Sequence, residues 1–205
     1  GDDAYLKSSE NVALMVNDTE LGVYVIKNGS VKLYNDNALK LETIATGVNV
    51  TGGIRVGGNN AANELDDYEE GTWTITATAE SGTVSLHSNV NQGAYVKVGR
   101  LVHVSVRVNI SAVSGQSGYL RLSLPFATSN TGPDQSWGSI FPCYTTNIDL
   151  PDNTVSTMGE PWQNTAYVNF MAQYDDSLWV AVNSNLLDAG GSEYISFVTT
   201  YITDS

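Results

Sequence analysis

Apolar and polar residues alternate strictly in the middle of this chain, along residues 102–110. Alternation with period two puts the apolar side chains on one face of an extended strand, whereas an amphipathic helix repeats every 3.6 residues. The apolar positions of this segment are Val102, Val104, Val106, Val108 and Ile110. Similar alternation recurs in residues 72–79, 119–124, 167–174 and 194–201. The pattern predicts an all-β protein whose antiparallel sheets have one buried and one solvated face.

The first 62 residues contain shorter strand-like segments, separated by turn signals such as Asn28-Gly29 and Gly52-Gly53. The expected strands are Val12–Val16, Gly22–Ile26, Ser30–Tyr34, Leu39–Thr43, Gly47–Val50 and Ile54–Val56. Strands this short bury little, and about 60 residues are marginal for an independent domain. Two interpretations fit the pattern. One is a fibrous β-rod in which several chains intertwine, and the other is a β-meander packed on the rest of the chain.

An acidic run over residues 63–74 divides the chain into two parts of different character. We expect residues 1–62 to form a β-rich shaft segment. Residues 63–205 are expected to form a C-terminal head, a jelly-roll-like antiparallel β-sandwich. A turn is expected at Ser114–Gly118, and the stretch 127–165 is expected to be irregular because it is rich in turn-forming residues.

The charge balance excludes several classes of partner. The chain has 22 acidic and 9 basic residues, a net charge of −13. Nucleic-acid binding needs a basic surface, and so does docking on anionic lipid, so neither partner is expected. No run of 18 apolar residues occurs, so no membrane insertion is expected. The single cysteine, Cys143, excludes an intrachain disulfide and a Cys-based zinc site.

Signatures of catalysis are weak, and we expect no enzymatic activity. The two histidines, His87 and His103, lie in separate predicted strands and share no metal-ligand spacing. Cys143 lies among apolar neighbours and is expected to be a small buried residue. Glycoside hydrolysis would need two carboxylates facing each other across a cleft. The available carboxylates are Asp134, Asp149, Asp152, Glu160, Asp175 and Asp176, and the sequence does not pair them.

The acidic run is also the weak candidate for a metal site. Asp66 and Asp67, with Glu69 and Glu70, offer the oxygen ligands that divalent cations prefer. The spacing of an EF-hand loop is absent, and a solvated acidic linker explains the residues equally well. We therefore expect no cofactor, with a structural divalent cation as the alternative.

Aromatic and amide side chains in the stretch 127–165 suggest a binding surface for a glycan. Sugar rings stack on flat aromatic faces, and their hydroxyl groups bond to amides and carboxylates. The candidate ligand-binding residues are Trp137, Tyr144, Trp162, Asp134, Gln163 and Tyr174. The alternative for each ring is a place in the core or in a subunit contact. Trp73 and Trp179 lie in predicted strands and are expected in the core.

Several phrases resemble the tail fibres of tailed bacteriophages. The phrases lie in residues 30–52 and in residues 65–74, which resemble the opening of the C-terminal domain of such fibres. The runs Ala94–Val104 and Leu124–Ala127 fit the same domain. The resemblance implies a homotrimer, with an intertwined rod and a distal β-sandwich head that binds the host cell surface. It also implies that the chain is part of the virion, at the extracellular end of a tail fibre.

The function expected from this resemblance is attachment of the virion to the host, through a cell-surface glycan or an outer-membrane receptor. Two alternatives remain open. The chain could belong to a tailspike that degrades polysaccharide, or it could be a purely structural fibre or decoration protein of the virion.

Overall fold

A computed structural model describes residues 5–130, 140–175, 179–188 and 193–204. The chain divides into two compact units, residues 1–66 and 67–205, and the division falls inside the acidic run. The described residues form strands and two short 3-10 turns, η1 (Ala61–Asn63) and η2 (Ser184–Leu186). The expected all-β class, with several antiparallel sheets in a sandwich, is confirmed.

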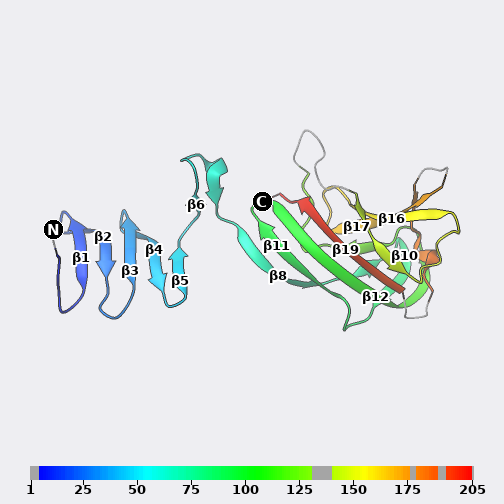
Figure 1. Ribbon diagram of the computed structural model, residues 1–205, viewed down its shortest axis with the longest axis horizontal. Coiled ribbons are helices and arrows are strands. Elements are labelled where there is room, and N and C mark those ends of the chain that lie inside the picture. Colours follow the sequence, from blue (N-terminus) through cyan, green and yellow to red (C-terminus); the bar gives the residue numbers. More distant parts are fainter. Residues whose placement is uncertain (1–4, 131–139, 176–178, 189–192, 205) are drawn as a thin grey trace. The chain divides into compact units, whose positions relative to one another are not determined.

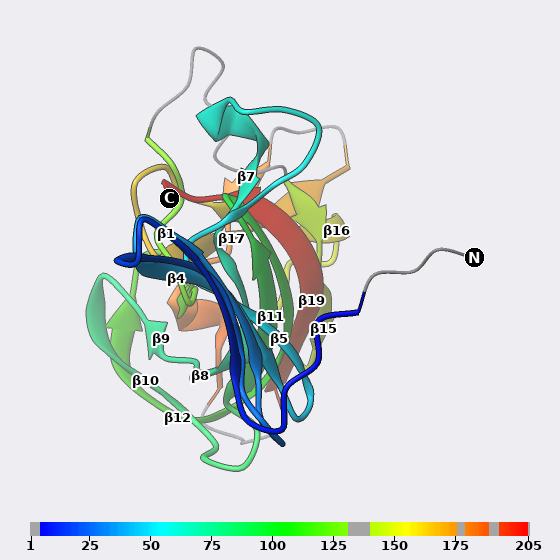
Figure 2. The same cartoon turned by 90° about the vertical axis from the view of Figure 1, so that its left-hand side faces the viewer.

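The first unit contains one antiparallel sheet in which each strand pairs with the next along the chain (Figure 1). Its strands are β1 (Val12–Val16), β2 (Glu20–Val25), β3 (Val31–Asn35), β4 (Ala38–Ile44) and β5 (Gly47–Val50). Figure 2 looks along this row of strands, which overlap in a single layer. Residues such as Asn17, Asn28 and Asn37 adopt positive φ angles in the connecting turns, as tight turns require. A separate hairpin joins β6 (Ile54–Arg55) to β7 (Glu64–Leu65), where the Arg55 guanidinium binds the Glu64 carboxylate.

The register of the five-stranded sheet separates its two faces by chemistry. Directly paired residues share a face, so the pairings join one residue from each strand into a row. One row is entirely aliphatic and consists of Leu14, Val23, Leu33, Leu41 and Val50. The neighbouring row on the opposite face consists of Ala13, Tyr24, Lys32, Glu42 and Asn49. Among the described residues of this unit, no large apolar side chain is fully buried within one chain.

The second unit is a sandwich of two antiparallel sheets. The first sheet has the order β15-β19-β12-β11-β8, and β10 also pairs with β12. The second sheet has the order β14-β16-β17-β13-β9, and β18 also pairs with β17. The first sheet is built from β8 (Tyr68–Thr74), β10 (Ser81–Leu86), β11 (Gln92–Val98), β12 (Leu101–Ser117), β15 (Tyr144–Thr146) and β19 (Glu193–Ile202). The second is built from β9 (Ala77–Thr78), β13 (Arg121–Ser123), β14 (Phe141–Pro142), β16 (Thr154–Pro161), β17 (Tyr167–Tyr174) and β18 (Val180–Ala181).

The core of the sandwich lies between the alternating faces that the sequence predicted. Val102, Val104, Val108 and Ile110 of β12 are completely buried, and Val106 is nearly so. They pack in one cluster with apolar residues of the second sheet. The members from that sheet and the segment before β13 include Leu120, Leu122, Val168 and Phe170.

Two expectations about local structure are wrong. The stretch 127–165 is not irregular, because its described residues include β14, β15 and β16. Ser114–Gly118 is not a separating turn, since β12 continues to Ser117 and pairs there with β10. The glycines in this region allow close backbone approach: a Cβ on Gly82 would lie 2.3 Å from the backbone carbonyl carbon of Gly115. Tertiary pairing thus extends the strand through residues that locally favour a turn.

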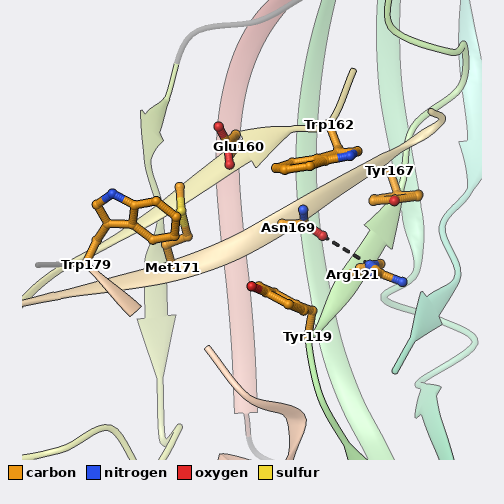
Figure 3. A pocket seen from close by; sticks show the side chains of 8 residues that line it. All are labelled: Tyr119, Arg121, Glu160, Trp162, Tyr167, Asn169, Met171 and Trp179. Carbon is orange, nitrogen blue, oxygen red and sulfur yellow. Dashed lines mark hydrogen bonds between the residues drawn. The ribbon is translucent and has the colours of Figure 1, made fainter. Parts of the chain in front are cut away.

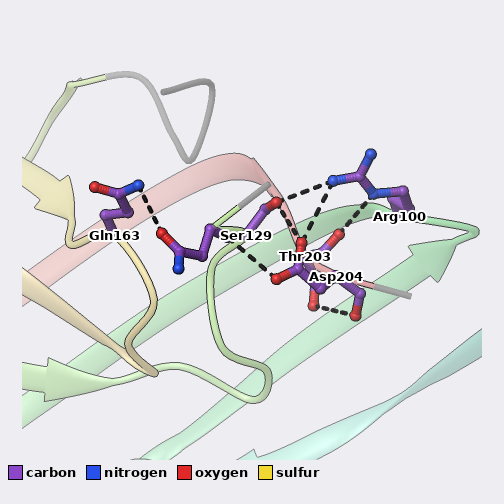
Figure 4. A network of polar contacts seen from close by, with 6 residues as sticks. Arg100, Ser129, Gln163, Thr203 and Asp204 are labelled. Carbon is purple, nitrogen blue, oxygen red and sulfur yellow. Dashed lines mark hydrogen bonds and ion pairs between the residues drawn. The ribbon is translucent and has the colours of Figure 1, made fainter. Parts of the chain in front are cut away.

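Hydrogen bonds and an ion pair connect the end of β19 to the neighbouring loops (Figure 4). The Nε atom of Arg100 donates to the Thr203 carbonyl oxygen at 2.9 Å, and its Nη2 atom donates to the Ser129 hydroxyl at 2.9 Å. The Ser129 hydroxyl donates to the Asp204 carboxylate, which also lies 3.6 Å from Arg100. Gln163, a predicted glycan ligand, donates to the Asn130 side chain at 2.9 Å beside this network.

Candidate binding cleft

A cleft lies on the face of the second sheet that points away from the core (Figure 3). Strand β17 presents Val168, Phe170 and Ala172 to the core, so its alternate residues point to the other side. Asn169 pairs directly with Glu160 of β16 and with Arg121 of β13. These three polar residues therefore form one row across the floor of the cleft.

Four aromatic rings and a thioether surround this polar row. The rings belong to Tyr119, Trp162, Tyr167 and Trp179, and the thioether belongs to Met171. Trp162 is 46% exposed and Trp179 is 52% exposed, so part of each indole is accessible at the cleft. The cleft has a volume of about 210 Å³. It is smaller than the roughly 300–1,000 Å³ of a typical small-molecule pocket, which suits a single ring of a larger ligand.

Arg121 is held in place on several sides. Its Nε atom donates to the Asn169 side-chain oxygen at 3.1 Å, and its Nη2 atom lies 3.5 Å from the Glu80 carboxylate. The guanidinium carbon lies 4.8 Å from the ring centre of Tyr167 and 5.8 Å from that of Tyr119. Stacking between two rings and pairing with a carboxylate fix the orientation of the guanidinium.

The Glu160 carboxylate, unlike the Arg121 guanidinium, is not held by polar contacts with the described residues. Within the described part of the chain, no residue donates a hydrogen bond to its carboxylate and no cation pairs with it. Partial burial raises the pKa of Glu160 above its ordinary value, because the charged form loses hydration without gaining a partner.

The structure brings only one of the predicted glycan ligands into the cleft, namely Trp162. Tyr144 is 67% exposed on β15, in the other sheet. Tyr174 is half-buried and packs against the core. Trp137 and Asp134 lie outside the described residues. The remaining candidate, Gln163, is not a lining residue of the cleft and instead donates a hydrogen bond to the Asn130 side chain, beside the network of Figure 4.

The expectation that Trp179 lies in the core is wrong, because more than half of its surface is exposed at the cleft. Trp73 does pack against the core, and its Nε1 atom donates to the Ser123 carbonyl oxygen at 3.2 Å. Sequence reasoning also missed Tyr119, Tyr167 and Asn169 as cleft residues. The signal for Tyr167 and Asn169 is the alternation of β17, whose second face carries large side chains that are not charged. Tyr119 lies before β13, outside that strand.

The residues considered for other chemistry have ordinary surroundings. Burial raises the pKa of the Cys143 thiol to about 12, so the thiolate is disfavoured. His103 is exposed and contacts the Thr200 hydroxyl at 3.0 Å. Asp67 forms an ion pair with the nearly buried Lys97 ammonium of β11. Across the described residues, no three side chains of His, Cys, Asp or Glu gather as a possible metal site. The described residues also contain no helix long and apolar enough to cross a membrane.

Comparison with known proteins yields a likeness of fold. No protein-family model matches the chain, and no curated protein matches it. Among solved structures, the chain resembles the Dettilon tailspike protein (gp208), with a TM-score of 0.52 and 19% sequence identity. The match covers 66% of this chain and 23% of the tailspike chain, so this chain spans less than a quarter of that protein. At this identity the match shows that the two proteins share a β fold over the aligned region.

Proposed function

We propose that this chain is the receptor-binding end of a bacteriophage tail fibre, and that its cleft binds a saccharide on the host cell surface. The cleft of Figure 3 is the observation that carries this proposal. Exposed indoles beside amide, guanidinium and carboxylate groups are the combination that stacks on a sugar ring and bonds to its hydroxyl groups. The likeness of fold to a tailspike protein supports a place in the phage tail.

Binding without cleavage accounts best for the described lining of the cleft. Glu160 is the only carboxylate among the lining residues that the structure describes, and a glycosidase mechanism uses two. The alternative, a polysaccharide-degrading tailspike, is favoured by the name of the structural neighbour. A reducing-end assay on capsular polysaccharide and lipopolysaccharide separates the two, because release of sugar ends would contradict the binding function.

The proposed assembly is a homotrimer in which the aliphatic rows of the first unit face each other. In a single chain, Leu14 and Leu33 of this row are 51% and 39% exposed. Val48 lies on the same face, two residues before Val50, and is 56% exposed. A sheet face this apolar is rarely left in water over a large area, and other copies of the same face cover it in the proposed trimer. Mass measured by light scattering at several concentrations tests this assembly.

The function is tested by binding of fluorescently labelled chain to a panel of bacterial strains, measured by flow cytometry. Trp162→Ala and Trp179→Ala each remove one exposed ring of the cleft. Each should weaken cell binding about 10-fold to 100-fold, the range of a central aromatic contact. Tyr144→Ala removes a more exposed ring from the other sheet and serves as the matched control.

Equal losses in all three variants would contradict the assignment of binding to the cleft. Absence of binding to every strain, with an intact assembly, would favour the alternative of a purely structural virion protein.

A further inference from the structure

Glu160 has an unusual place among the polar groups of the cleft. It lies at one end of the row that continues through Asn169 to Arg121. Figure 3 shows its carboxylate on the same side of the sheet as the indole of Trp162, two residues further along the strand. Within the described residues this carboxylate has no cationic or hydrogen-bonding partner. Among the described residues, this partly buried anion beside aromatic rings therefore has a place for a cationic ligand.

Arg121 does not fill this role, although it lines the same cleft. Its Nε atom is bound to Asn169, and its Nη2 atom lies beside Glu80. Tyr167 and Tyr119 hold the guanidinium 4.8 Å and 5.8 Å from their ring centres. The positive charge of Arg121 is thus already matched by a carboxylate, and two of its donors are engaged. An acidic sugar would find little free positive charge here and would be repelled by Glu160.

A carboxylate next to exposed aromatic rings is complementary to an alkylammonium group. The ammonium donates charge-assisted hydrogen bonds to the carboxylate, and its attached carbon atoms and positive charge favour the ring faces. Such a ligand would also oppose the effect of burial on the pKa of Glu160, because a cation beside the carboxylate favours its charged form.

We propose that the cleft selects a saccharide that carries a protonated amine, with the ammonium bound by Glu160 and the sugar ring packed on Trp162 and Trp179. This inference rests on the proposed function of the cleft, and it adds the chemical class of the saccharide. A non-acetylated amino sugar is the simplest member of this class. Its N-acetylated form has the same ring and linkage but no charge.

Three tetrasaccharides with the same β-1,4 linkage test the proposal by isothermal titration calorimetry with the whole chain. They are built from glucosamine, N-acetylglucosamine or glucose, so they differ at a single ring position. The calorimetry is run at a mildly acidic pH, at which the amines of the glucosamine probe are protonated. This probe should bind about 10-fold to 100-fold more tightly than the other two, the range of a charge-assisted hydrogen bond.

Two isosteric variants separate the site from the general negative charge of the protein. Glu160→Gln should remove the preference for the glucosamine tetramer. Glu69→Gln removes the same charge from exposed β8 in the other sheet and should keep the preference. The proposal is overturned if the three probes bind equally or not at all, or if Glu160→Gln retains the preference.

The cell-binding assay distinguishes failure of this inference from failure of the proposed function. If Trp162→Ala abolishes cell binding while Glu160→Gln leaves it unchanged, the cleft binds a saccharide that has no ammonium group, and the inference alone is wrong. If Trp162→Ala leaves cell binding unchanged, the function proposed for the cleft is itself wrong. Loss of cell binding in both tryptophan variants and in Glu160→Gln, with Glu69→Gln unaffected, supports both.

Discussion

Replacing Leu33 by Asp tests the proposed homotrimer at the middle of its apolar face. Leu33 is the central member of the row that runs from Leu14 to Val50 across the five strands. It is 39% exposed in the single chain, so this fraction of the side chain remains to be covered by other copies. The substitution removes the apolar side chain and places a carboxylate at the same position in every subunit.

The size of the effect follows from the exposed fraction. Complete burial of a Leu side chain contributes about 1.5–3 kcal/mol, so covering the exposed 39% contributes about 0.6–1.2 kcal/mol in each chain. Three chains give about 2–3.5 kcal/mol in the trimer, which is about 30-fold to 400-fold in the association equilibrium. Desolvation of three carboxylates adds to this loss. Leu33→Asp should therefore move dissociation to much higher protein concentrations.

Size-exclusion chromatography with light scattering, run over a concentration series, measures this change directly. Asn49→Asp is the matched control, because it adds the same charge on the opposite, polar face of the sheet. Leu33→Thr keeps a strand-forming residue and should weaken the trimer less than Leu33→Asp does. A wild-type chain that is monomeric throughout would refute the reasoning. A Leu33→Asp trimer as stable as that of Asn49→Asp would also refute it.

Three further predictions concern the second unit. Native Cys143 should react with iodoacetamide at pH 8 far more slowly than the unfolded chain does, because burial raises its thiol pKa to about 12. Glu160→Gln should increase the free energy of unfolding in urea at pH 7, because burial raises the folded-state pKa of Glu160 and its ionised form therefore destabilises the fold. Below about pH 4 the Glu160 carboxyl is protonated in both states, so the variant should lose this advantage. Tyr201→Phe should cost about 1–3 kcal/mol in the same urea assay, because the buried hydroxyl donates to the Phe126 carbonyl at 3.1 Å and accepts from its amide at 3.3 Å.

The elements that could be predicted from the sequence are those marked by a local apolar or alternating run between turn-forming residues. Val12–Val16 and Gly47–Val50 were placed at their observed bounds, and so was Tyr167–Tyr174. The predicted inward face of β12 is also correct, because period two fixes which residues share a side. These features depend on residues close in sequence, so no knowledge of strand partners is needed to find them.

The errors arose where partners distant in sequence override local preference. Gly115 and Gly118 have positive φ angles, which local rules assign to a turn. Pairing with β10 nevertheless keeps residues up to Ser117 in β12. In the same way, the eight-residue strand β16 pairs with β17 although it lies in a stretch that is rich in turn formers. Its strand character depends on that partner more than on its own composition.

The cleft could not be assembled from the sequence because its floor joins β13 to the hairpin of β16 and β17, which comes much later in the chain. Arg121, Glu160 and Asn169 become neighbours only through the register of β13, β16 and β17. The rule that places strand aromatics in a core also failed for Trp179, which lies just before β18 and lines the cleft. Strand β17 itself has two occupied faces. One face fills the sandwich, and the other carries Asn169 and Met171 under exposed rings. A strand with large side chains on both faces, lying between a core and a row of polar groups, therefore marks the candidate cleft, to which the stretch 127–165 contributes only Trp162 among the described glycan-ligand candidates.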